Sequence, residues 1–301
     1  MRTTRRAVLA GAGAALAAPA FGAVAGEAVV KRIPATGEQV SAVGLGSWIT
    51  FNVGTDPVLR AECRAVMAAF FEAGGGMIDS SPMYGSSQEV IGDALAKLGR
   101  PAGLFSADKV WTRATDGPAQ IAETARCWNV ERFDLLQVHN LIDWERNLDT
   151  LAAMKEAGAL RYTGVTTSHG RRHAELEEVM RRRAPDFVQL TYNIVDREAE
   201  RRLLPLALER GIAVICNRPF QRGRLPDRLA GRPMPGWARE IGVSTWPQFL
   251  LKFILSHPAV TAAIPATRQV DHLRENKSAA FGPMPDAAMR RRMAEHVLEA
   301  G

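Results

Sequence analysis

Residues 134–166, DLLQVHNLIDWERNLDTLAAMKEAGALRYTGVT, contain one complete strand–helix–strand unit. The apolar run Asp134–His139 has the length and composition of a buried strand, and residues 144–157 repeat their apolar positions with the spacing of a helix. A second strand, Tyr162–Thr166, follows the helix. Because a strand that returns through a helix crosses over in the right-handed sense, the two strands are expected to be parallel.

The same unit repeats along most of the chain. The predicted strands are Val43–Gly46, Gly76–Asp79, Leu104–Lys109, Asp134–His139, Tyr162–Thr166, Phe187–Leu190, Ala213–Cys216 and Thr261–Ile264. The predicted helices cover residues 57–73, 86–98, 118–128, 144–157, 171–182, 196–209, 245–255 and 269–280. Val29–Ile33 and Gln39–Val40 are expected to pair as a hairpin before the first unit. This alternation predicts an α/β fold, a (β/α)8 TIM barrel with a short N-terminal hairpin.

A doubly wound parallel sheet is the alternative architecture for such alternation. It usually carries a G-x-G-x-x-G loop after its first strand, where the dinucleotide phosphates bind. Here Gly44 and Gly46 are followed by Trp48 and Ile49, with no third glycine at that spacing. The barrel is therefore favoured. The segment 220–244, rich in Pro, Gly and Arg, is long for a barrel connection and is expected to cover the mouth of the barrel.

The N-terminal residues have the layout of an export signal. Basic residues precede an apolar stretch from Ala7 to Ala20, and small residues at 23–25 offer a cleavage site. Residues 1–26 are therefore assigned to the signal and residues 27–301 to the barrel domain. The stretch TRRAVL at 4–9 resembles the twin-arginine motif, with a general secretory signal as the alternative.

Such a signal implies contact with the export machinery and a periplasmic or otherwise exported protein. The apolar stretch is mostly Ala and Gly, which is too weakly hydrophobic for a stable membrane span.

The charge of the chain does not indicate a nucleic-acid partner. The formal net charge is +6, but Arg2, Arg5 and Arg6 in the signal account for half of that excess. The run Arg181–Arg183 is interpreted as a solvated helix end. The three cysteines are widely spaced, so neither a disulfide framework nor a metal site is expected.

Polar residues stand where three of the predicted strands end. Asp79 ends the second strand, Lys109 the third and His139 the fourth, and Tyr84 lies in the loop after Asp79. Each has a structural explanation by itself, as a loop cap, a solvated strand end, a core histidine or a packing residue. Since the carboxyl ends of barrel strands carry the functional groups, the four together predict a catalytic group.

The segment IDSSPMYG at 78–85 resembles the D-x4-Y-G signature of the aldo-keto reductases. The segments DKVW at 108–111 and LQVHN at 136–140 match the family's lysine and histidine strands, and the resemblance runs from about residue 30 to residue 280. It implies an NADP(H)-dependent oxidoreductase that interconverts a carbonyl and an alcohol by hydride transfer.

The predicted chemistry explains why these residue types are needed. Reduction of a carbonyl requires a proton at oxygen, which Tyr84 can donate as a general acid if its pKa falls from about 10 towards the working pH. Lys109, ion-paired with Asp79, is expected to lower that pKa. His139 is expected to hydrogen-bond the substrate oxygen.

The resemblance also implies a set of cofactor-binding residues at the ends of the later strands. They are Thr166, Gln189, Asn217, Arg218, Arg268, Glu275 and Asn276. The chain departs from the family in this set, because Thr166-Thr167 replaces a Ser-Asn pair and Asn217 replaces a tyrosine that stacks on nicotinamide. Ala266 and His272 stand where strongly NADP-selective members have Lys and Arg. NADP is the favoured cofactor, through Arg268 and the 2′-phosphate, with NAD as the alternative.

Trp48, Trp111 and Asn140 are the candidates for the wall of a largely hydrophobic substrate pocket, with core packing as the alternative for the tryptophans. Arg222 and Arg224 are weaker candidates for holding a phosphate or carboxylate. The rival function is a cofactor-binding redox sensor or partner protein with little turnover. A lyase or hydrolase is disfavoured because no metal-ligand cluster or nucleophile–base pair stands at the strand ends.

Overall fold

The computed structural model describes residues 28–113 and 116–299, so the predicted export signal lies outside the described residues. The two pairing strands at the start are β1 (Val30–Arg32) and β2 (Gln39–Ser41). The strands of the main sheet are β3 (Leu45–Gly46), β4 (Met77–Asp79), β5 (Phe105–Val110), β6 (Phe133–Val138), β7 (Leu160–Thr166), β8 (Phe187–Thr191), β9 (Ala213–Asn217) and β10 (Val260–Ala263).

The main sheet is parallel throughout and closes on itself. Its strands lie in sequence order from β3 to β10. The first and last strands meet through parallel bridges that join Val43 to Ala263 and Gly46 to Ala266. The amide of Gly44 donates to the carbonyl of Ala263 over 2.9 Å, which adds to this closure. The predicted (β/α)8 barrel with its N-terminal hairpin is confirmed.

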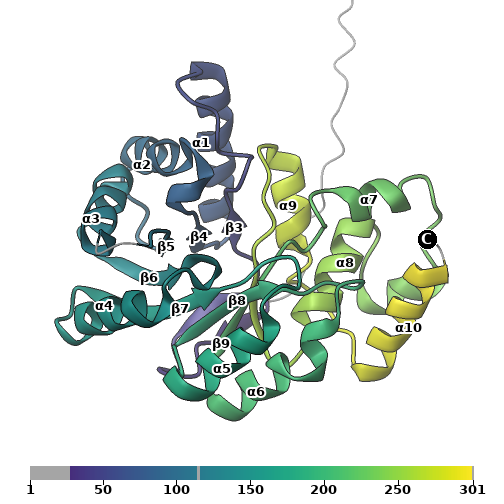
Figure 1. Cartoon of the computed structure of the whole chain (residues 1–301). Coiled ribbons are helices and arrows are strands. Elements are labelled where there is room, and N and C mark those ends of the chain that lie inside the picture. The colour runs from purple at the N-terminus through teal and green to yellow at the C-terminus, as the bar shows by residue number, and fades with distance from the viewer. Residues whose placement is uncertain (1–27, 114–115, 300–301) are drawn as a thin grey trace, which may run out of the picture.

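Helices cover the outside of the sheet (Figure 1). They are α1 (Pro57–Glu72), α2 (Ser87–Lys97), α3 (Gly117–Trp128), α4 (Trp144–Glu156), α5 (His173–Arg183), α6 (Leu203–Arg210), α8 (Trp246–Leu255) and α9 (Val270–Ser278). The predicted helix 196–209 is divided, since a 3-10 turn, η3 (Glu198–Arg201), precedes α6. None of the helices in the described part of the chain has the length and hydropathy needed to cross a membrane.

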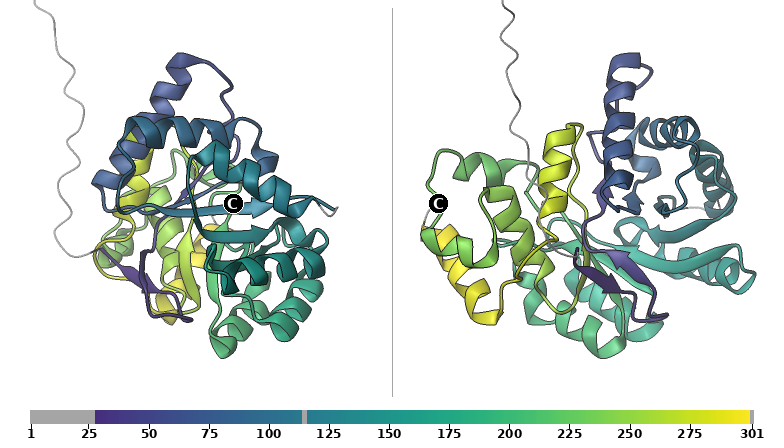
Figure 2. Two further views of the ribbon diagram at one scale, coloured as in Figure 1. Left: turned by 90° about the vertical axis from the view of Figure 1, so that its left-hand side faces the viewer. Right: turned by 180° about the vertical axis from the view of Figure 1, so that it is seen from behind.

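The hairpin of β1 and β2 plugs the amino-terminal end of the barrel, as the view from behind in Figure 2 shows. Ile33 and Val40 are buried in the same cluster as Phe105 and Tyr162, which fill the interior of the sheet. The hydroxyl of Tyr162 donates to the carboxylate of Glu38 over 2.6 Å. Since this end is filled, a ligand that reaches the strands must do so from their carboxyl ends.

After β9, three elements were not predicted, namely α7 (Arg224–Leu229), the 3-10 helix η4 (Gly236–Ile241) and α10 (Ala287–Glu299). Rings of η4 and α10 meet, with the centroids of Trp237 and His296 5.8 Å apart. Only the first residues of segment 220–244 reach back to the barrel mouth, where the Arg222 guanidinium lies 4.2 Å from the ring centre of Trp48. The rest of the segment packs beside α8 and α10, which corrects the expectation that the whole segment covers the mouth.

Candidate active site

The four predicted catalytic residues lie together at the carboxyl ends of β4, β5 and β6. Lys109 Nζ donates to Asp79 Oδ2 over 2.6 Å and to the carbonyl of Ser80 over 2.7 Å. Both charged side chains are buried, with exposed fractions of 0% for Lys109 and 2% for Asp79. This ion pair is therefore fixed in a region without water. His139 follows β6 directly.

Tyr84 is held beside this pair by a short 3-10 turn, η1 (Pro82–Tyr84). The Ser81 hydroxyl begins the turn by accepting the amide of Met83. Lys109 Nζ lies 5.1 Å from the centre of the Tyr84 ring. The rings of Tyr84 and His139 are perpendicular, with centroids 5.7 Å apart. The phenol therefore lies against both the ammonium and the imidazole.

Burial sets the protonation of Tyr84 more strongly than its neighbours do. It raises the pKa of Tyr84 to about 12, while Lys109 acts in the opposite direction and Asp79 raises the pKa further. Lys109 thus has the expected effect, but its charge is balanced by the carboxylate of Asp79 and does not outweigh the loss of water. The expectation that the pKa falls towards the working pH is wrong for the protein without ligand. Tyr84 carries its proton at neutral pH.

His139 is a neutral imidazole at neutral pH. Burial and, to a smaller extent, the nearby charge of Lys109 together lower its pKa to about 3. Nδ1 of the ring and the hydroxyl of Ser81 are hydrogen-bonded over 2.7 Å. One serine therefore fixes both the turn that carries Tyr84 and the orientation of the histidine.

Two glutamine amides hold the second oxygen of Asp79. Gln189 Nε2 donates to Asp79 Oδ1 over 2.8 Å, and Gln137 Nε2 donates to the same atom over 3.2 Å. Gln189, predicted to meet the cofactor, is thus part of the support of the catalytic carboxylate. Gln137 was not predicted. Gln137 stands two residues before His139 in the predicted strand Asp134–His139, and this spacing, which places side chains on one face of a strand, offered a signal.

The altered residues after β7 and β9 form a connected polar group. Asn217 Nδ2 donates to the carbonyl of Thr167 over 2.9 Å, and Asn217 Oδ1 accepts the hydroxyl of Thr191 over 2.7 Å. Thr166 Oγ1 accepts the amide of Asn140 over 2.9 Å. The hydroxyl oxygen of Thr167, in contrast, is buried and has no hydrogen-bond partner within residues 28–113 and 116–299. Thr167 is therefore better placed than the predicted Thr166 to receive a ligand.

Arg218, at this end of the barrel, also has a hydrogen-bond donor that is not used by the described residues. Its Nε is buried and has no partner in the described part of the chain. Its carbonyl accepts the side-chain amide of Asn193 over 3.1 Å. A buried donor without a partner is unfavourable, so Arg218 and Thr167 together mark places where a polar ligand fits.

A cavity of about 760 Å³ lies between α1 and the loop that joins β10 to α9. Arg268, the residue predicted to bind the 2′-phosphate, is among the residues that line it. Its Nε donates to Glu62 Oε2 over 3.1 Å. Glu62, from α1, also lines the cavity and was not predicted. Glu275 and Asn276 lie in α9, where Asn276 is buried and Glu275 is partly exposed.

The predicted substrate residues differ in exposure. Trp48 is partly buried under the Arg222 guanidinium, and Asn140 lies in the 3-10 turn η2 (His139–Leu141). Trp111 is 40% exposed after β5, where its backbone pairs with the side chain of Gln120. Trp48 and Trp111 are therefore not core residues.

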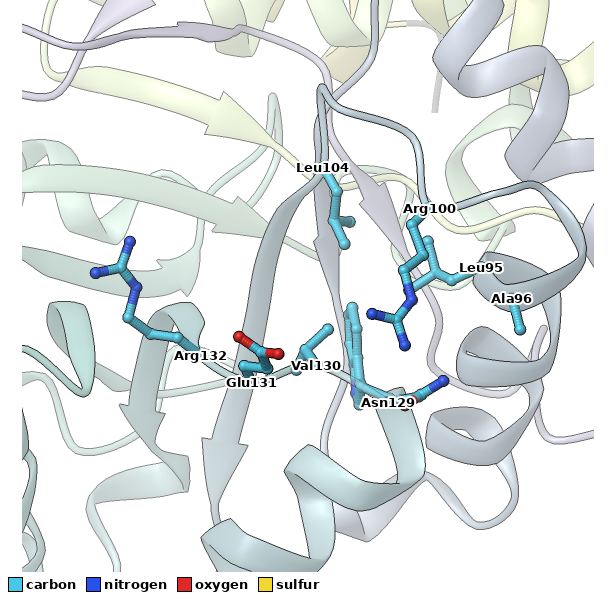
Figure 3. Close-up of a pocket in the computed structure, with 9 residues that line it drawn as sticks. Leu95, Ala96, Arg100, Leu104, Asn129, Val130, Glu131 and Arg132 are labelled. Atoms are coloured by element: carbon cyan, nitrogen blue, oxygen red, sulfur yellow. The ribbon is translucent and has the colours of Figure 1, made fainter.

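A second hollow, of about 610 Å³, lies at the opposite end of the strands and is shown in Figure 3. Leu104, which precedes β5, and Arg132, which precedes β6, line it with Asn129, which follows α3. It is therefore separate from the catalytic group. No cluster of three or more potential metal ligands occurs in residues 28–113 and 116–299.

Asp108 is a buried carboxyl that the sequence did not single out. It points away from Lys109 on the same strand and accepts hydrogen bonds from Trp128 Nε1 over 2.6 Å and from Gln88 Nε2 over 3.0 Å. Burial raises its pKa to about 7. Since these partners come from α3 and α2, Asp108 holds two helices against the strand that carries Lys109.

Comparison with known proteins agrees with this geometry. Residues 42–294 match the model of the aldo/keto reductase family. The chain belongs to this family of oxidoreductases. It is 26% identical over 267 residues to the NADH-specific methylglyoxal reductase of Escherichia coli strain K12, an alignment that covers 75% of this chain and 78% of the relative.

Solved aldo-keto reductase structures have the same fold. One from Klebsiella pneumoniae, in complex with NADP and acetate, gives a TM-score of 0.72 at 23% identity and covers 87% of this chain and 93% of that chain. The holo form of one from Bacillus halodurans gives a TM-score of 0.73 at 22% identity, with coverage of 91% and 98%. Both support the assignment of the barrel.

Proposed function

We propose that this aldo-keto reductase is an NADP(H)-dependent enzyme that interconverts an aldehyde or ketone and an alcohol, with Tyr84 as general acid. The observation that carries the proposal is the proximity of the Tyr84 ring to both the ammonium of Lys109 and the imidazole of His139. An acid, a buried cation and a neutral hydrogen-bonding ring are thus neighbours at the carboxyl ends of the strands. This is what a carbonyl oxygen needs as it gains charge.

The residues of this chain perform the proton half of the reaction. The reduced dinucleotide, when bound, supplies a hydride to the carbonyl carbon. The Tyr84 hydroxyl gives its proton to the carbonyl oxygen, and the resulting tyrosinate is stabilised by Lys109 until a proton from solvent restores it. His139, neutral and oriented by Ser81, hydrogen-bonds the same oxygen. Because its pKa is raised, Tyr84 keeps its proton at neutral pH but is a weaker acid than an ordinary tyrosine, so proton donation depends on Lys109 to stabilise the tyrosinate.

The residues at the later strands fit a nicotinamide dinucleotide. Thr167 Oγ1 and Arg218 Nε are buried and have no hydrogen-bond partner among the described residues, and they would hold the polar groups of the nicotinamide end. Arg268 borders the cavity beside α1, where it would hold the phosphate of the adenosine end. The solved structure from Klebsiella pneumoniae is a complex with NADP, whereas the relative from Escherichia coli is NADH-specific. NAD(H) is therefore the second candidate.

Tyr84→Phe tests the assignment. We expect this variant to bind NADPH normally and to lose about 100-fold or more in turnover, since general acid catalysis contributes roughly 10²–10⁴. Tyr162→Phe is the matched control, because its hydroxyl lies on the hairpin at the other end of the barrel. Turnover of small aldehydes and quenching of tryptophan fluorescence by NADPH are the two measurements.

The outcome separates two functions. Near-normal carbonyl reduction by Tyr84→Phe would show that Tyr84 is not the general acid. Tight NADPH binding by the native protein without turnover of any carbonyl would instead favour the redox sensor. That function is the alternative because Thr167, Asn217 and Ala266 replace the family's usual cofactor-binding residues.

We also propose that residues 1–26 direct export by the twin-arginine route and that residues 27–301 are the mature enzyme. Support comes from the TRRAVL motif at 4–9. This route exports folded proteins, so the barrel would carry its dinucleotide outwards. Replacement of Arg5 and Arg6 by lysine should retain folded protein in the cytoplasm, as cell fractionation would show. Normal export of the double variant would contradict the proposal.

A further inference from the structure

Glu62 and Arg268 form an ion pair on the wall of the cavity between α1 and α9. They lie 206 positions apart in the sequence, and their side chains meet over 3.1 Å because α1 packs against α9 in the closed barrel. The side chains are 45% and 37% exposed, respectively. A ligand in the cavity therefore reaches both the carboxylate and the guanidinium.

The two charges favour different ligands. A guanidinium binds a phosphate through paired N–H donors, whereas a carboxylate accepts hydrogen bonds and repels a phosphate. In dinucleotide sites an acidic side chain that receives the ribose 2′-hydroxyl favours NAD, and an arginine favours the 2′-phosphate of NADP. This cavity has one residue of each kind, in contact with each other.

Among the described residues that line the cavity, no second cation accompanies Arg268 to strengthen phosphate binding. Ala266, on the same wall, has no polar side chain. The hydroxyl of Thr267 accepts the amide of Gln269 over 3.0 Å and so is used to hold the loop. On α1, the side chain of Arg60 is turned away to the carbonyl of Gly54 at 2.7 Å. Arg268 is thus the cation among the described residues of this wall. Its guanidinium is already hydrogen-bonded to the carboxylate of Glu62.

We propose that Glu62 is a specificity-determining residue of the dinucleotide site. Its carboxylate holds the Nε edge of Arg268, opposes a 2′-phosphate and accepts an unphosphorylated ribose 2′-hydroxyl. The native protein accordingly uses NAD(H) as well as NADP(H), with a small preference between them. The inference rests on the proposed dinucleotide-dependent function, which it deepens.

Binding titrations with NADH and NADPH test the inference without reference to turnover. Glu62→Gln should tighten NADPH by about two- to tenfold, since a partly exposed charge contributes modestly. NADH should bind equally or more weakly, because an amide oxygen is a poorer acceptor than a carboxylate. Glu72→Gln is the matched control, because Glu72 ends the same helix and is exposed outside the cavity.

A double variant shows whether Glu62 acts through Arg268. The Kd ratio of NADH to NADPH should rise in Glu62→Gln and fall in Arg268→Ala. In Glu62→Gln/Arg268→Ala the increase due to the first substitution should largely disappear, as expected for coupled neighbours. Raised ionic strength should reduce the effect of Glu62→Gln on NADPH, because the pair is partly exposed.

Each result decides the question. A Kd ratio in Glu62→Gln that matches those of the native protein and Glu72→Gln overturns the inference and leaves the proposed function intact. A strong preference for NADPH in the native protein, by about 100-fold or more, also overturns it. If neither dinucleotide binds the native protein, the proposed function and the inference fail together.

Discussion

Two ion pairs of this barrel differ in how far solvent reaches them. Lys109 and Asp79 are 0% and 2% exposed, at the centre of the catalytic group, whereas Arg268 and Glu62 are 37% and 45% exposed, on the wall of the cavity beside α1. The buried pair has lost its water, so each charge depends on the other. The exposed pair keeps its water, so either charge is available to a ligand. Burial therefore makes one pair a fixed part of the candidate catalytic group and leaves the other free to act as the cofactor selector that we propose.

The largest expected effect comes from breaking the buried pair. Lys109→Met should lower turnover by about 100-fold or more, because tyrosinate loses its cation. It should also destabilise the fold by about 3–5 kcal/mol, since Asp79 is left charged and buried. Lys155→Met is the matched control, because its pair with Asp186 is partly exposed, and should cost about 0–1 kcal/mol. Urea denaturation and turnover assays provide both measurements.

Removal of the exposed cation should change affinity rather than turnover. Arg268→Ala should weaken NADPH by about 1.5–3 kcal/mol, the contribution of one charge-assisted hydrogen bond, and NADH by less. Calorimetric titration of both nucleotides provides the comparison. Equal losses for NADH and NADPH would show that Arg268 does not bind the 2′-phosphate.

The pH dependence should differ between the two directions of the reaction. Because burial raises the pKa of Tyr84 to about 12, the hydroxyl stays protonated and reduction should be nearly independent of pH from about 6 to about 9. Alcohol oxidation needs the tyrosinate, so its rate should rise about tenfold per pH unit in that range. A plateau of the oxidation rate near pH 8 would show that the bound ligands lower the pKa of Tyr84.

The smallest expected effect is on stability at the exposed pair. Glu62→Gln, Arg268→Gln and the double variant should show a coupling free energy below about 1 kcal/mol in thermal or urea unfolding. A coupling free energy between Glu62 and Arg268 as large as that of the buried pair would show that the two ion pairs do not differ in their contribution to stability.

The repeated strand–helix pattern was sufficient to predict the barrel, and the D-x4-Y-G segment was sufficient to locate Asp79 and Tyr84. Helix α10 was missed although Asp286 caps its first turn and accepts the amide of Met289 over 2.7 Å. Met293 and Val297, one turn apart, are buried on its inner face. Its signals are local, so it belongs to the predictable part of the fold.

The elements that form and the residues that end the strands can be inferred from the sequence, because periodicity and strand-end polarity are local properties. The behaviour of those residues, in contrast, depends on how the chain packs in three dimensions. The pKa of Tyr84 is raised because the closed barrel removes water from its side chain, and this burial cannot be inferred from a sequence motif. Glu62 meets Arg268 only because closure brings the first helix beside the last strand's loop, and a contact across 206 positions leaves no local signal.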